Sequence, residues 1–173
     1  MHILSRLKLI KTFVFDMDGV LTDGNLLVDH ENNWLRQMNI RDGYALQLAA
    51  KSGFNIIIIS GSNSSQVSER LNKLGITNVF MDVQDKEKLL KELAFKKELA
   101  LSEILYMGDD IPDLSCMRIV GISACPADAT FEIKEIASYI SPARGGCGCV
   151  RDVIEKVLKL NNKWPLFTMI PST

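Results

Sequence analysis

Residues 13–23 read FVFDMDGVLTD, and this stretch decides how the rest of the chain is interpreted. The run from Ile10 to Phe15 is rich in β-branched and aromatic residues, which is typical of a buried strand. It ends in Asp16 and Asp18, whose side chains we expect on the same side because strand side chains alternate. Two neighbouring carboxylates there are unfavourable unless a cation lies beside them. The alternative is a plain Asp-Gly turn after a strand.

The composition is that of an ordinary globular protein. The chain has 173 residues, of which 47% are hydrophobic and 24% are charged, which suits a single domain over residues 1–173. A net charge of −1 offers no basic surface for nucleic acid. No apolar run approaches the roughly 20 residues that span a bilayer, and the N-terminus lacks the pattern of a secretion signal. We therefore expect a cytoplasmic protein that binds neither nucleic acid nor membrane.

The cysteines and histidines show no zinc-binding pattern. The residues are Cys116, Cys125, Cys147, Cys149, His2 and His30, and none of the spacings is Cys-x-x-Cys. Cys147 and Cys149 are more often small packing groups than metal ligands, although a metal or a reactive role stays open. Reduced thiols fit the expected cytoplasmic location.

Strands and helices alternate along the chain. Short apolar runs that read as buried strands occupy residues 10–15, 55–59, 78–81, 104–107, 119–123 and 139–141. Helical patterns lie between them, at residues 44–51, about 85–100 and 130–137, and after the glycines of 145–148. A further helix carries Val67, Leu71 and Leu74 and ends at Gly75. The pattern predicts an α/β fold, a Rossmann-like, doubly wound and mostly parallel sheet with helices on both faces. Ligand sites in such sheets lie at the carboxyl ends of the strands.

Two segments depart from this alternation. Residues 26–28 and 34–38 look like short strands joined by a turn at 29–33, which predicts a β-hairpin within residues 24–38. Its apolar side chains need a partner, either their own domain or another subunit. Residues 161–173 contain two prolines and read as an irregular tail. Its apolar residues Trp164, Leu166, Phe167 and Met169 either pack locally or cover a neighbour's site.

Polar side chains from distant parts of the chain should meet at one edge of the sheet. Asp16, Asp18 and Asp109 suit a hard cation with oxygen ligands, most simply Mg²⁺. Ser60 offers a hydroxyl at a strand end, and Lys86 adds a positive charge at a helix start, where backbone amides favour anions. Each of these residues alone has an ordinary structural interpretation. Together they form a site for a phosphoryl group, whose transfer requires positioning and charge neutralisation.

Four motifs in order resemble those of the haloacid dehalogenase superfamily of phosphotransferases. They are residues 16–20 (DMDGV), Ser60, Lys86 and residues 108–113 (GDDIPD). The resemblance implies that Asp16 is the nucleophile and forms an aspartyl-phosphate. It also implies that Asp18 protonates the leaving oxygen and then activates water.

The same resemblance assigns the remaining groups of the site. Ser60, Gly61 and Lys86 would hold the phosphoryl oxygens. Mg²⁺ would take Asp16, Asp109 and the backbone carbonyl of Asp18. Asp113 would orient Lys86 or the metal-bound water, with Asp110 as a further supporting carboxylate.

The loop lengths place the chain in the capless branch of the superfamily. Residues 19–59 and 61–85 are too short to hold a cap domain. In that branch a hairpin after the first motif builds a homotetramer, and neighbouring subunits close each active site. Residues 18–24, 39–44, 106–110, 125–129 and 145–152 resemble the family of 3-deoxy-D-manno-octulosonate 8-phosphate phosphatases. The implied substrate is a phosphorylated sugar acid of lipopolysaccharide synthesis.

Position 62 departs from the family pattern. The family usually has Arg there, and related phosphatases of nonulosonate 9-phosphates often have Glu, but this chain has Ser62. A sialic or deaminoneuraminic acid 9-phosphate is therefore the alternative substrate. Arg70 and Lys73 lie at i, i+3 spacing and would reach a neighbour's site, unless they are a solvated helix face. Ser62 and Asp23 are further candidates for substrate binding.

A non-catalytic interaction protein on the same fold is the alternative from another functional class. Such a protein would be expected to have lost a catalytic residue, and none of the residues that the motifs require is missing.

Overall fold

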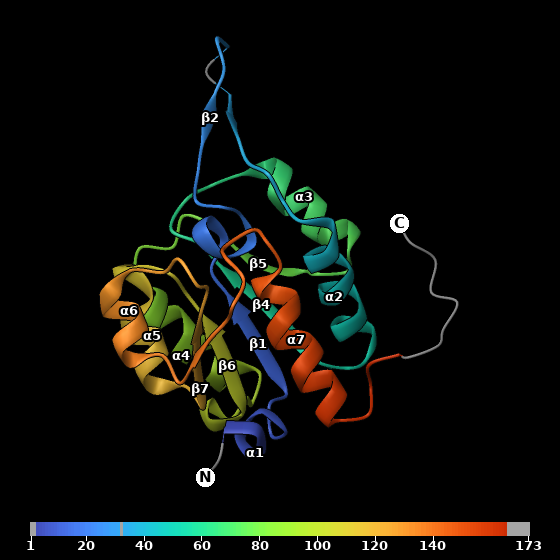
Figure 1. Cartoon of the computed structure of the whole chain (residues 1–173). Helices are drawn as coiled ribbons and strands as arrows, with labels where there is room; N and C mark the ends of the chain where they lie inside the picture. The colour runs from blue at the N-terminus through green and yellow to red at the C-terminus, as the bar shows by residue number, and fades with distance from the viewer. Residues whose placement is uncertain (1–2, 32, 166–173) are drawn as a thin grey trace.

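A six-stranded parallel sheet forms the centre of the computed structural model, which describes residues 3–31 and 33–165 (Figure 1). The strand order is β5-β4-β1-β6-β7-β8, with every neighbouring pair parallel. The strands are β1 (Thr12–Phe15), β4 (Asn55–Ile59), β5 (Asn78–Phe80), β6 (Ile104–Met107), β7 (Ile122–Cys125) and β8 (Tyr139–Ile140). The predicted doubly wound α/β fold is confirmed, and its first strand lies inside the sheet.

Helices cover both faces of the sheet, as Figure 1 shows. They are α1 (Ile3–Leu7), α2 (Ile40–Lys51), α3 (Ser65–Lys73), α4 (Lys86–Lys96), α5 (Leu114–Ile119), α6 (Phe131–Ile136) and α7 (Cys149–Leu160). Residues of α2, α3 and α7 share a core with Phe13 and Phe15 of β1. Residues of α4, α5 and α6 share a second core with Val14. Successive side chains of β1 thus enter opposite cores, which explains why Phe13, Val14 and Phe15 are all apolar.

Several element boundaries differ from the sequence prediction. Helix α2 begins at Ile40 rather than Tyr44, because the Asn39 side chain accepts hydrogen bonds from the backbone N–H groups of Arg41 and Asp42 and so caps the helix. Strand β7 begins at Ile122, since Ile119 belongs to α5, a short helix that was not predicted. Helix α1 was not predicted either, and α4 ends at Lys96, short of residue 100.

The predicted hairpin forms a separate two-stranded sheet that extends from the body of the protein (Figure 1). Its antiparallel strands are β2 (Leu27–Val28) and β3 (Trp34–Leu35). The side chains of Leu27 and Trp34 are 67% and 61% exposed. Within the described part of the single chain, their own domain does not cover these apolar residues.

The start of the tail packs on the body of the domain. Trp164 makes an edge contact with Tyr44, and the Arg151 guanidinium lies over the Trp164 ring. Residues 166–173, including Leu166, Phe167 and Met169, lie outside the described residues, as does Asn32 in the hairpin turn. In the part of the chain that the structure describes, no helix has both the length and the apolar character needed to cross a membrane.

Candidate active site

The loop after β1 places Asp16 and Asp18 at the carboxyl end of the sheet. The Asp16 backbone N–H donates to the Met107 carbonyl at 3.0 Å, so Asp16 still continues the strand. The next residues, Met17–Leu21, form a wide turn, η1, in which the backbone angles of Asp18 and Gly19 are not helical and Gly19 has a φ of +83°. Asp18 therefore lies outside the strand, and the expectation based on strand alternation is wrong in that detail. Both carboxylates nevertheless line the same pocket.

Two glycines make room for the acidic side chains. A Cβ atom on Gly19 would lie 2.0 Å from Oδ2 of Asp109, and one on Gly108 would lie 2.3 Å from Cβ of Asp113. Real Cβ atoms do not approach other atoms this closely. The glycines of the first and fourth motifs thus allow the carboxylates to lie close together.

A polar pocket of about 310 Å³ opens at this edge of the sheet. It gathers residues of all four motifs: Asp16, Asp18, Ser60, Gly61, Ser62, Lys86, Asp109, Asp110 and Asp113, with Gly24 and Pro112. The structure thus brings together every predicted catalytic, phosphate-binding and metal-binding residue.

Lys86 lies buried between two carboxylates. Its Nζ donates to Asp16 Oδ1 at 2.8 Å and to Asp113 Oδ1 at 2.7 Å. Burial disfavours the ammonium, but the charges of Asp113 and Asp16 outweigh it and raise the pKa of Lys86. The buried hydroxyl of Tyr106 also donates to Asp113 Oδ1, at 2.6 Å. Asp113 is therefore fixed from two sides, and it fixes Lys86 in turn.

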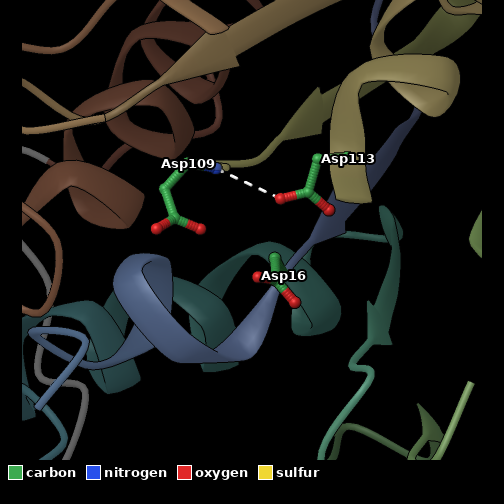
Figure 2. A group of neighbouring side chains, drawn as sticks. All are labelled: Asp16, Asp109 and Asp113. Carbon is green, nitrogen blue, oxygen red and sulfur yellow. Dashed lines mark hydrogen bonds between the residues drawn. The ribbon is translucent and has the colours of Figure 1, made fainter. Parts of the chain in front are cut away.

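Three carboxylates surround a common space, which Figure 2 shows. Asp16, Asp109 and Asp113 each offer an oxygen, and these oxygens lie within 4.8 Å of one another. Burial and the charge of Asp113 raise the pKa of Asp16 to about 7. Burial and the charges of Asp16 and Asp113 raise the pKa of Asp109 to about 8. A single lysine thus leaves uncompensated negative charge, so the donor set fits a divalent cation with oxygen ligands.

The three carboxylates are not equally available to a cation. Asp113 accepts from Lys86 and Tyr106 at Oδ1 and from the Asp109 backbone N–H at Oδ2. Asp16 accepts only from Lys86 among the side chains, and no side chain donates to Asp109 within the described residues. Asp16 and Asp109 are therefore the carboxylates with lone pairs free for a metal ion.

Asp18 is held by a residue that the sequence analysis missed. Arg36, directly after β3, donates from Nε to Asp18 Oδ1 at 2.7 Å and from Nη2 to Oδ2 at 3.1 Å. The Ser62 hydroxyl donates to the same Oδ2 at 2.6 Å. Burial opposes ionisation of Asp18, but the donors Arg36 and Ser62 outweigh it and lower its pKa. In the sequence, Arg36 is a single basic residue after the apolar Trp34 and Leu35, and nothing in this pattern indicates a contact with Asp18.

The candidate substrate-binding residues lie in different places. Ser62 lines the pocket, and its backbone N–H donates to Ser60 Oγ at 3.1 Å. Asp23 is exposed, and its carboxylate accepts from the backbone N–H and the side-chain amide of Asn25. Arg70 and Lys73 do not line the pocket of their own chain; Lys73 pairs with Glu69 at 2.7 Å.

The glycine-rich segment before α7 supports the turn that carries Asp18. The Gly146 N–H and the Cys149 thiol both donate to the Val20 carbonyl, at 3.0 and 3.3 Å. A Cβ atom on Gly145 would lie 2.0 Å from the Gly19 carbonyl oxygen, so this contact requires glycine. Cys149 is therefore a buried residue that supports this turn, whereas Cys147 is exposed.

Comparison with known proteins identifies the family. The family model of haloacid dehalogenase-like hydrolases matches residues 82–145. A curated relative from Salmonella typhi, 3-deoxy-D-manno-octulosonate 8-phosphate phosphatase KdsC, is 32% identical over 162 residues, covering 94% of this chain and 86% of the relative. This chain belongs to the KdsC family of haloacid dehalogenase-like phosphatases. It is therefore an enzyme, a phosphatase, and the non-catalytic alternative is set aside.

Solved structures of KdsC family members share this fold. The structure of 3-deoxy-D-manno-octulosonate 8-phosphate phosphatase from Moraxella catarrhalis, in complex with magnesium ion, phosphate ion and KDO, has a TM-score of 0.90 at 34% identity and covers 93% of each chain. The Yersinia pestis enzyme has a TM-score of 0.90 at 31% identity, covering 92% of this chain and 86% of its own. The α/β fold described above is therefore the fold of these KdsC phosphatases.

Proposed function

We propose that this phosphatase hydrolyses 3-deoxy-D-manno-octulosonate 8-phosphate to the free sugar acid and phosphate, with Mg²⁺, in lipopolysaccharide biosynthesis. The observation that carries the proposal is the Asp16 carboxylate on a polar pocket, bound to Lys86 at 2.8 Å and close to Asp109. The names of the KdsC relatives support the substrate. Four free cysteines are compatible with the cytoplasm as the place of the reaction.

In the proposed first step, Asp16 displaces the sugar from phosphorus. Lys86 holds Oδ1 of Asp16, which leaves Oδ2 free to attack. A bond forms between this oxygen and phosphorus while the ester bond breaks, and Asp18 gives a proton to the departing alcohol oxygen. The product of this step is an aspartyl-phosphate on Asp16 and the free sugar acid.

In the second step, water hydrolyses the aspartyl-phosphate. Asp18, now unprotonated, accepts a proton from the water as its oxygen bonds to phosphorus, and the bond to Asp16 breaks. Phosphate leaves, and both carboxyl groups return to their first state. Ser60, Gly61 and Lys86 bind the phosphoryl oxygens in both steps.

A bound Mg²⁺ supplies neutralisation of the charge on the transferring phosphoryl group. Asp16, Asp109 and the Asp18 backbone carbonyl would hold it. Asp113 and Tyr106 keep the Lys86 ammonium in place beside this set. Asp110 lines the pocket, but its carboxylate accepts from the adjacent Ile111 N–H, so we assign it to shaping the loop.

We also propose a homotetramer formed through the hairpin of residues 24–38. The exposure of Leu27 and Trp34 supports this assembly. Arg70 and Lys73, which do not line their own pocket, would reach the site of a neighbouring subunit and bind the sugar-acid carboxylate.

A nine-carbon substrate is the second candidate, because position 62 has neither the Arg of the eight-carbon class nor the Glu of the nine-carbon class. The hydroxyl of Ser62, which stands there, donates to Asp18 instead. The test is phosphate release with Mg²⁺ from a panel that contains the eight-carbon acid phosphate, sialic and deaminoneuraminic acid 9-phosphates, and simple sugar phosphates. We expect the highest kcat/KM on the eight-carbon acid. Equal turnover of simple sugar phosphates would contradict the substrate assignment.

A further inference from the structure

Asp42 is a buried carboxylate that the proposed mechanism does not use. It lies in the first turn of α2, is only 2% exposed and does not line the pocket. Its Oδ1 accepts from the Arg151 backbone N–H at 2.7 Å, and its Oδ2 accepts from the Gly148 N–H at 3.2 Å. Both N–H groups belong to the start of α7, which lies beside α2 (Figure 1). Asp42 therefore caps a helix other than its own.

Helix α7 needs a cap from outside because its own N-cap residue has no side chain. That residue is Gly148, whose φ of +109° favours glycine over the Asp, Asn or Ser that usually caps a helix. A negative charge at the N-terminus of a helix is also favoured by the helix dipole. Asp42 thus supplies the acceptor oxygens that Gly148 lacks.

Side chains from two further places hold residues 145–148, the glycine segment, in front of α7. The Gly145 N–H donates to Asp128 Oδ1 at 2.9 Å, and the Asn39 side-chain amide donates to the Gly146 carbonyl at 3.2 Å. Together with the cap on α7, three side chains hold this segment by its backbone. Because glycine backbones have wide conformational freedom, these bonds select one path for the segment.

The glycine segment lies directly against the turn that carries Asp18. A Cβ atom on Gly145 would lie 2.0 Å from the Gly19 carbonyl oxygen, and one on Gly19 would lie 2.0 Å from Asp109 Oδ2. The glycine segment, the turn η1 and the Asp109 carboxylate are therefore in successive close contact. Movement of the segment would leave η1 free to shift away from Asp109.

We propose that Asp42 is a positioning residue, which fixes the place of the Asp18 carbonyl relative to the Asp109 carboxylate through α7 and the glycine segment. Mg²⁺ sites require oxygen ligands at about 2.1 Å in nearly octahedral geometry, so even a small displacement of η1 weakens binding of the cation. This inference rests on the proposed function for the role of the cation. The path from Asp42 to η1 can be tested without it.

The first test measures hydrogen exchange of the metal-free protein in EDTA, well below the melting temperature. It compares wild type, Asp42→Asn and Val157→Ala. In Asp42→Asn the side-chain amide faces the Gly148 N–H donor to donor, so a cap bond is lost while the shape of the side chain is kept. Val157→Ala is the matched control, because it removes buried packing near the C-terminal end of the same helix.

We expect Asp42→Asn to exchange at least about threefold faster than wild type in peptides that cover residues 145–151 and also in those that cover residues 17–24. Val157→Ala should leave residues 17–24 as they are in wild type. Faster exchange in residues 145–151 alone would make the cap merely structural and would overturn the proposal. An equal rise at residues 17–24 in both variants, or no rise in either, would overturn it as well.

The second test is calorimetric titration of Mg²⁺ into the metal-free protein. We expect the Kd for Mg²⁺ to rise at least about fivefold in Asp42→Asn and to keep its wild-type value in Val157→Ala. An unchanged Kd in Asp42→Asn would overturn the effect of Asp42 on the cation. A wild type that binds no Mg²⁺ would refute the proposed function instead, and the exchange of residues 17–24 would still decide whether Asp42 holds η1.

Asn39→Asp is the second variant, which decides the question if Asp42→Asn does not fold. Its carboxylate can still accept from the backbone N–H groups at the start of α2, but it cannot donate to the Gly146 carbonyl. We expect faster exchange at residues 17–24 and a higher Kd for Mg²⁺ than in wild type. Wild-type values of both in Asn39→Asp would contradict the support of η1 by the glycine segment.

Discussion

Lys86 Nζ donates a hydrogen bond of 2.8 Å to Oδ1 of Asp16 and so joins the first residue of α4 to the end of β1. The two residues are 70 positions apart in the chain. In this contact Oδ1 of Asp16 accepts from the buried Lys86 ammonium, and Oδ2 is left without a bond to the lysine. A nucleophile held in this way loses little orientational freedom on meeting the phosphoryl group.

Substitution of Asp16, the proposed nucleophile, should abolish turnover without unfolding the protein. In Asp16→Asn the side chain keeps its shape but can no longer form the acyl phosphate, so we expect kcat to fall by at least about 10³-fold. The melting temperature should stay equal or rise, because one member of a crowded carboxylate group becomes neutral. Phosphate release and thermal melting measure the two effects. Activity close to wild type would refute the role of Asp16.

Removal of the buried lysine should damage both activity and stability. Lys86→Met leaves Asp16 and Asp113 without their common partner, and breaking a buried ion pair costs about 3 kcal/mol of unfolding free energy. We expect a lower denaturation midpoint in urea and a fall in kcat/KM of about 10²-fold or more. Lys88→Met on the exposed side of the same helix is the matched control and should change neither. A similar loss in both variants would point to the helix rather than to the ion pair.

The metal-free protein should become less stable as the pH rises towards 8. The pKa of Asp16 is raised from 3.8 to about 7, and that of Asp109 from 3.8 to about 8. Between about pH 4 and pH 8 the folded chain therefore binds more protons than the unfolded chain, so each rise in pH favours unfolding. In EDTA the melting temperature should fall across pH 5.5 to 8.5, and Asp109→Asn should reduce this slope. A melting temperature that climbs over this range would contradict the raised pKa values.

Metal and phosphate mimic should stabilise the protein together. A ligand that binds only the folded state raises the melting temperature, and the effect grows with the logarithm of the ligand concentration relative to its Kd. We expect Mg²⁺ with orthovanadate to raise the melting temperature more than the two separate effects combined, because the anion and the cation neutralise each other in one pocket. Asp109→Asn should lose most of this joint effect. Simple additivity in the wild type would argue against a shared site.

Loss of the apolar hairpin surface should dissociate the proposed tetramer. Light scattering at micromolar concentration should give a tetrameric mass for the wild type and a smaller mass for the double variant Leu27→Asp, Trp34→Asp. Phe95→Ser is the control, since Phe95 is 87% exposed on α4, away from the hairpin, and should leave the mass unchanged. A monomeric wild type would refute the assembly.

The fold was predictable because strong local signals agreed with one another. The apolar residues of β1, β4 and β6 are buried on both sides and could form only central strands. The boundaries were harder to place where a side chain competes with the local pattern. The Asn39 cap makes α2 start at Ile40, ahead of the apolar pattern that predicted it. Helix α5 has only six residues, which is too short to show a helical periodicity in the sequence.

The site was predictable in its motifs but not in its contacts. Asp16, Lys86 and Asp109 each follow a strand or begin a helix, so the topology of the sheet brings them together. Arg36 was out of reach, because its approach to Asp18 depends on the path of the hairpin and not on any spacing in the sequence. The hydrogen bond from the Tyr106 hydroxyl to Asp113 could not be predicted either, because a tyrosine in a buried strand is usually just a core residue.

The support of η1 by residues 145–149 has a consequence for biosynthesis. The turn bearing Asp18 is made among the first residues of the chain, yet its carbonyl at Val20 is bound by Gly146 and Cys149. During synthesis the turn therefore lacks both of these hydrogen bonds until residues 146–149 have been added. A fragment that ends before Gly146 would keep all the acidic residues of the pocket but would lack both donors that hold the turn bearing Asp18.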